Sequence, residues 1–171
     1  MKKHVDFNVE IDDRVKGTMP RDDDLYLVGL SLIVFNRFYP FMIELLRHDP
    51  EVEDNWYVLM DMSLKGIAEN LASFICRTYG INDVEKKKHV TEALDDLVER
   101  RNRIVHAFVA TDETGQALYT KTKHNLHAPE KRDQQFHITR EYLQDFISAV
   151  KDMDYKLDDF REYLKSRGMA S

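Results

Sequence analysis

Apolar positions along most of the chain recur at the three- and four-residue spacing of an amphipathic helix. Four long segments show this pattern, and they cover residues 25–48, 56–80, 81–108 and 139–168. Apolar residues are so dense in the first segment that we expect much of its circumference to be buried. Pro40 should kink or break this helix after Tyr39. The pattern therefore predicts four long helices.

Residues with cap preferences stand at several of these boundaries. Gly80 follows the second segment and Gly168 the fourth, as is usual where a helix ends in a left-handed residue. Asn82 or Asp83 can cap the start of the third segment, and Thr139 the start of the fourth. The cap residues and the apolar spacing thus predict the same helices.

Two stretches depart from the helical pattern. Val5, Phe7, Val9 and Ile11 alternate with polar neighbours, which predicts a strand, so residues 1–20 are expected to form an N-terminal arm or edge strand. In the second stretch, residues 108–138, two β-prone runs flank the sequence DETG and predict a hairpin followed by a polar loop. We therefore expect one all-α domain covering residues 1–171, an up-and-down four-helix bundle with a small hairpin between the third and fourth helices.

Composition and charge narrow the class of protein. The 171 residues are 43% hydrophobic and 33% charged, which suits one soluble domain. No run of 18 or more apolar residues is present, and the start lacks the apolar stretch of a signal peptide, so we expect a cytoplasmic protein without a membrane span. The net charge of −6 argues against a general basic surface for nucleic acid, so a polyanion should bind locally. Cys76, the single cysteine, is expected to be a core residue.

The third helical segment carries a cation inside its apolar stripe. At about 100° per residue, Arg101 falls at the centre of the stripe formed by Val90, Leu94, Leu97, Val98, Ile104, Val105 and Phe108. One edge of the stripe is polar and consists of Thr91, Asp95, Glu99, Asn102 and His106. Arg101 and His106 can both reach a cleft at the helix end, with Asn102 between them.

These residue types suit phosphate chemistry. RNA cleavage without a metal needs a group of near-neutral pKa to move a proton and a fixed cation to meet charge growing on the phosphoryl oxygens. His106 fits the first role and Arg101 the second. A structural interpretation is equally open: Arg101 could pair with a carboxylate of another helix, and His106 could cap the helix C-terminus. The spacing alone does not choose between them.

The sequence ERRNRIVHAF, Glu99 to Phe108, resembles the R-N-x-x-x-H signature of the HEPN superfamily, with Arg101, Asn102 and His106 at the motif positions. The position of the motif, near the end of the third long helix and before an insertion and a last amphipathic helix, is also similar. The resemblance implies a metal-independent endoribonuclease in which two subunits of a homodimer bring their motifs together. His106 would move the proton, Arg101 would stabilise the phosphorane, and Asn102 would orient groups or bind phosphate.

The same resemblance suggests roles for three neighbours of the motif. Glu99 would tune or position His106, while Arg100 and Arg103 would help to hold the RNA backbone. Such a protein could be a toxin or a phage-defence effector, with RNA as its substrate and an antitoxin or another protein as a partner. The alternative is a non-catalytic HEPN-like module that binds RNA or protein.

Other chemistries have less support. His124, His127 and His137, with Glu130 or Asp133, could be imagined as a metal site, but they match no established ligand spacing. The chain also lacks the glycine-rich and zinc-protease motifs of nucleotide-binding proteins and metalloproteases. We therefore expect neither a metal nor a cofactor.

Overall fold

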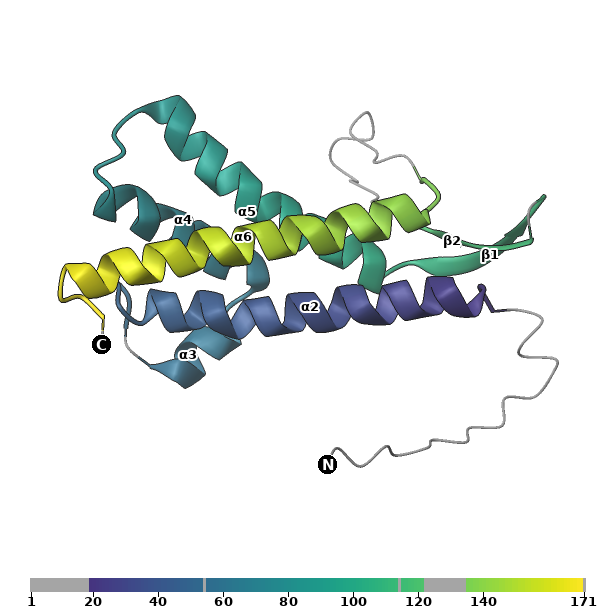
Figure 1. Cartoon of the computed structure of the whole chain (residues 1–171), viewed down its shortest axis with the longest axis horizontal. Helices are drawn as coiled ribbons and strands as arrows, with labels where there is room; N and C mark the ends of the chain where they lie inside the picture. The colour runs from purple at the N-terminus through teal and green to yellow at the C-terminus, as the bar shows by residue number, and fades with distance from the viewer. Residues whose placement is uncertain (1–18, 54, 114, 122–134, 171) are drawn as a thin grey trace, which may run out of the picture.

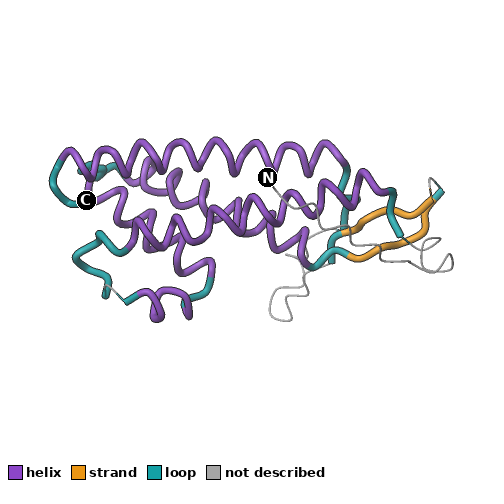
Figure 2. Tube along the Cα trace, turned by 60° about the horizontal axis from the view of Figure 1, so that its bottom comes forward, coloured by secondary structure: helices purple, strands orange, loops and turns teal. Residues whose placement is uncertain are grey.

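The computed structural model describes residues 19–53, 55–113, 115–121 and 135–170. In this part of the chain the elements are α2 (Asp22–Leu46), α3 (Trp56–Asp61), α4 (Leu64–Thr78), α5 (Val84–Val105), β1 (Phe108–Asp112), β2 (Gly115–Tyr119) and α6 (Arg140–Ser166). The four long helices pack together, and the hairpin projects beyond their ends (Figures 1 and 2). The predicted mostly helical fold with one hairpin before the last helix is confirmed, whereas the strand predicted within residues 1–20 lies outside the described residues.

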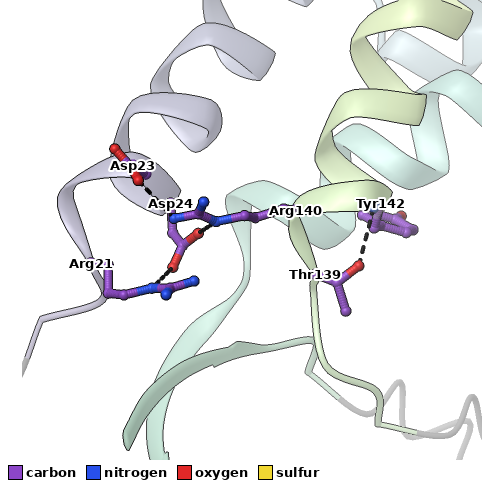
Figure 3. A network of polar contacts seen from close by, with 6 residues as sticks. All are labelled: Arg21, Asp23, Asp24, Thr139, Arg140 and Tyr142. Carbon is purple, nitrogen blue, oxygen red and sulfur yellow. Dashed lines mark hydrogen bonds and ion pairs between the residues drawn. The ribbon is translucent and has the colours of Figure 1, made fainter. Parts of the chain in front are cut away.

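The long helices do not alternate in direction, so the predicted up-and-down order is wrong. Arg140 at the start of α6 bonds to Asp24 at the start of α2, with 2.7 Å between Nε and Oδ1 (Figure 3). Near the ends of the two helices, Nη1 of Arg161 on α6 lies 3.7 Å from Oε1 of Glu44 on α2. The two helices are therefore parallel neighbours.

The direction of α4 follows from a half-buried ion pair at the other end of the molecule. Asp49, just after α2, is bonded by Arg77 in the last turn of α4, with 2.5 Å between the carboxylate and the guanidinium. The ends of α2 and α4 therefore meet, and these helices are parallel too. Only α5 among the four long helices runs the opposite way, as Figure 1 shows.

A helix break explains this arrangement. The sequence predicts one helix over residues 56–80, but the structure divides it into α3 and α4 at Met62 and Ser63, whose backbones are extended. Ser63 then caps α4, because its Oγ accepts a hydrogen bond from the N–H of Gly66 at 3.1 Å. The break lengthens the connection after α2, so the chain can return before α4 begins.

Helix α2 continues through Pro40, so of the predicted kink or break after Tyr39 the break does not occur. A proline inside a helix costs about 3 kcal/mol. The residues after it, including Met42, Ile43 and Leu46, are fully buried, and this packing offsets the cost. Burial around much of the circumference is found only in this second half of α2.

The first half of α2 is apolar but partly open. Tyr26 and Ile33 are each 68% exposed, and their apolar neighbours Leu27, Val28 and Leu32 are only half-buried. Among the described helices, α2 alone is long and apolar enough to cross a membrane, a criterion that core helices of soluble proteins also meet.

The predicted caps, hairpin and buried cysteine are confirmed. Asp83 caps α5 through the N–H of Lys86, and Thr139 caps α6 through the N–H of Tyr142. The strands β1 and β2 pair antiparallel, with Phe108 opposite Tyr119 at the base of the hairpin. The main core contains most large apolar residues of the helices, with Cys76 also buried.

Candidate functional site

The last turns of α5 project beyond the start of its neighbour. Helix α5 has 22 residues and the antiparallel α4 has 15, so α4 begins opposite the segment from Asp95 to Asn102. Most of the apolar stripe of α5 packs into the protein's own core, where the buried members are Leu94, Leu97, Val98 and Ile104. Arg101 lies at the centre of this stripe yet is only half-buried.

Among the described residues, no carboxylate neutralises the Arg101 guanidinium. Its Nη1 donates a hydrogen bond to Oδ1 of Asn102 at 3.1 Å, and its Nε is buried without a hydrogen-bond partner. Within the described ranges no ion pair joins Arg101 to an acidic residue. The carboxylate partner that the structural interpretation requires for Arg101 is therefore absent from this part of the chain. Asn102 fixes the orientation of the Arg101 guanidinium.

His106 ends α5. Its backbone N–H donates to the carbonyl oxygen of Asn102 at 3.0 Å, while its side chain is exposed. The helix C-terminus favours a cation at this position. Three apolar side chains beside it, Val105, Phe108 and Val109, are 40%, 37% and 40% exposed. The imidazole thus stands at an open, partly apolar end of the helix, about one and a half turns from Arg101.

A cavity of about 280 Å³ lies beside the motif, between the start of α4 and the last turns of α5. Asn102 forms part of its wall together with Asp95 and Glu99, and Ser63 and Lys65 line the opposite side. The sequence placed Asp95 on the polar edge but not in the site. Its spacing of four residues from Glu99 and seven from Asn102 is the signal that could have included it.

Asp95 is an unsatisfied carboxylate in this wall. Its Oδ1 is buried and has no hydrogen-bond partner. Burial raises the pKa of the Asp95 carboxyl, and the negative charges of Glu69 and Glu99 raise it further. The positive charge of Lys65 lowers the same pKa. Glu99 thus lies beside Asp95, and its predicted action on His106 stays a prediction.

We expect this carboxylate to make the folded state less stable as pH rises. Because the pKa of Asp95 is higher in the folded state than in the unfolded state, the folded protein binds the proton more tightly. The free energy of unfolding therefore decreases as pH rises from the ordinary Asp pKa through the raised one. Asp95→Asn should therefore raise the melting temperature at neutral pH and flatten its decline from acidic to neutral pH. Thermal melts across that range, with the exposed Asp145→Asn as control, test this; parallel curves for wild type and Asp95→Asn would contradict it.

The two arginines predicted to hold RNA contact aromatic rings. Arg100 lies over the rings of Tyr142 and Phe146 at 5.2 and 5.4 Å, and its Nη2 donates to the carbonyl oxygen of Tyr142 at 3.4 Å. Arg103 lies over Phe136 at 5.4 Å. Arg100 therefore joins α5 to α6.

Loss of this packing should be visible in stability. Arg100→Ala is expected to destabilise the fold by about 1–2 kcal/mol, because it removes two desolvated cation–π contacts and the aliphatic stem. Arg100→Lys should recover only part of this, since an ammonium lacks the planar fork. Chemical denaturation measures the effect, with the exposed Arg37→Ala as control. A variant of unchanged stability that loses RNA affinity would instead assign Arg100 to RNA contact.

The alternative metal site gains no support from the described residues. His137 stacks on Tyr119 with ring centroids 5.3 Å apart. His124, His127, Glu130 and Asp133 lie outside the described ranges. No group of three histidine, cysteine or acidic side chains able to hold a metal occurs in the part of the chain that the structure describes.

Comparisons of this chain with models of known protein families, with characterised proteins and with solved structures found no match.

Proposed function

We propose that this protein is a HEPN-type, metal-independent endoribonuclease, as the resemblance of Arg101, Asn102 and His106 to the R-N-x-x-x-H signature suggests. One observation carries the proposal. Asn102 orients the Arg101 guanidinium, which has no carboxylate partner among the described residues. This group lies at the projecting end of α5, on the same two turns as the exposed His106. Because it is not paired with one of these carboxylates, the Arg101 guanidinium can bind the anionic group of a ligand.

The chemistry assigned to this site is attack of a ribose 2′-hydroxyl on the adjacent phosphorus. The oxygen–phosphorus bond to the 5′-oxygen breaks, which leaves a 2′,3′-cyclic phosphate and a free 5′-hydroxyl. His106 moves the proton and Arg101 grips the phosphoryl oxygens as negative charge grows on them. Asn102 holds the Arg101 guanidinium in place through the 3.1 Å hydrogen bond.

A homodimer fits this chemistry, because one proton must leave the 2′-hydroxyl and another must reach the 5′-oxygen. Two copies of His106 can divide these tasks across a two-fold axis. The exposed Val105, Phe108 and Val109 beside His106 supply apolar area for a partner subunit. Under this proposal the second copy covers the projecting end of α5. Light scattering at micromolar concentration should show a dimer, and a monomer would remove the composite site.

The test is incubation of the protein with a mixed RNA pool in EDTA, followed by analysis of the product ends. We expect fragments with 2′,3′-cyclic phosphates, because a site built from arginine and histidine needs no metal. Cleavage that stops in EDTA, or a folded dimeric protein that leaves every RNA intact, would overturn the proposal.

A second candidate is the non-catalytic HEPN-like module that binds RNA or protein. Two observations favour it: the net charge of −6 weakens encounter with RNA, and Arg100 is used to join α5 to α6. In this case Arg101 and His106 are structural, and their alanine variants should lose thermal stability or dimerisation. The enzyme proposal expects His106→Ala to stay folded and dimeric.

A further inference from the structure

A second feature lies far from Arg101, in the wedge between α5 and α6. These helices contact each other where Arg100 meets Tyr142, and they diverge toward the start of α5 (Figure 1). An apolar groove of about 280 Å³ occupies the open side of this wedge, and the last turn of α4 closes its end. None of the residues of the R-N-x-x-x-H motif lines it.

The interior of the groove is hydrocarbon and aromatic. Its floor consists of Leu94, Leu157 and Phe160, which are 1%, 2% and 1% exposed. Val90 and Met153 form facing walls and are only half-buried, so apolar surface remains open to solvent. Such surface gains free energy when an apolar group covers it, and a flexible methionine can adapt to the shape of that group.

The rim of the groove carries a cation on one side and an imidazole on the other. His89 on α5 and Lys156 on α6 line it from opposite helices, and both side chains are exposed. Neither has an ion pair or hydrogen bond with any residue in the described ranges. An apolar interior with an ammonium group and an imidazole at its mouth is complementary to a molecule with an apolar body and one anionic end, which Lys156 attracts and to which both groups can donate hydrogen bonds.

We propose that this groove binds a small amphiphilic anion, an acyl chain with a terminal carboxylate. The chain lies on Leu94, Leu157 and Phe160, and the carboxylate lies between His89 and Lys156. The volume favours a small ligand, because pockets for larger molecules span about 300–1,000 Å³. A partner helix needs a longer surface, of about 800 Å² on each side for a stable complex.

The probe is decanoate, titrated calorimetrically into the full chain below its micelle concentration. Saturable binding of one decanoate per chain is expected. Lys156→Ala and His89→Ala should each weaken it by about fivefold, as for a partly exposed ion pair, while Lys151→Ala on the same helix should not. Ala93→Phe, which adds a ring to the groove wall, and Val90→Glu, which adds a negative charge, should remove binding in chains that melt as wild type does.

Three results would overturn the proposal. These are absence of saturable binding, undiminished binding by both Ala93→Phe and Val90→Glu, and equal affinity for decanol, decylamine and decanoate. The last result would show a purely apolar surface for another kind of partner. Because no nuclease measurement enters this test, its outcome is independent of the proposed ribonuclease activity.

Discussion

His106→Ala is expected to slow RNA cleavage by about 10²- to 10⁴-fold while the protein stays folded and dimeric. General acid–base catalysis by a positioned side chain contributes a rate factor of this size. The His106 imidazole is exposed, and the cap of α5 uses the backbone N–H of residue 106, which alanine retains. Initial cleavage rates in EDTA and thermal melts on the same samples measure both effects.

Arg101→Ala should cost about 10²- to 10³-fold in the same assay, because it removes the charge that meets the phosphoryl oxygens. Arg101→Lys keeps the charge but loses the planar fork, so it should recover only a small part. Arg37→Ala, which removes an exposed arginine on α2, is the matched control and should cleave as wild type does. Undiminished cleavage by Arg101→Ala and His106→Ala would remove the motif from the mechanism.

The features of the fold that could be predicted depend on neighbours in the sequence. Asp83 and Thr139 bond to backbone N–H groups three residues onward, so their cap roles are visible in the chain itself. The break at Ser63 is also local, but an apolar pattern that continues from Trp56 to Ile75 concealed it. A serine followed by Gly66 inside a long helical pattern is the signal that was available.

The features that could not be predicted depend on distant contacts. Helix α2 continues through Pro40 because Met42 and Leu46 pack into a core contributed by other helices. The parallel order of α2 and α6 depends on Arg140, which lies 116 residues from its partner Asp24. No spacing rule along one helix reports such pairs, and a topology chosen from short connections therefore fails when one connection contains α3.

The candidate site shows the same division. Helical periodicity correctly placed Arg101 at the centre of the apolar stripe and Asn102 beside it. The family resemblance gave Arg100 to RNA, although Asp96 stands four residues earlier and lies 3.7 Å from the Arg100 guanidinium in the structure. The structure adds a contact that the sequence does not show, with Tyr142, 42 residues away. The cavity beside Asn102 likewise needs Ser63 and Lys65 at the start of α4, which only the tertiary fold brings there.

Phe146→Ala is expected to destabilise the protein by about 3–5 kcal/mol, the range for removing a buried phenylalanine. Phe146 is fully buried on α6 and stacks on Phe35 of α2 with ring centroids 6.1 Å apart. The guanidinium carbon of Arg100 on α5 also lies 5.4 Å from the centroid of the Phe146 ring, so one side chain contacts three helices. For a chain of this length the melting temperature should fall by about 2–4 °C for each kcal/mol.

Tyr155→Ala removes an aromatic ring from the same helix at a position that is 62% exposed, and it should change stability by less than about 0.5 kcal/mol. Phe146→Leu should lie between this control and Phe146→Ala, because it keeps apolar volume but loses both ring contacts. The double variant Phe146→Ala/Arg100→Ala should lose less than the sum of the single changes, since the two residues share a contact. Additive losses would show that Arg100 and Phe146 stabilise α5 and α6 independently.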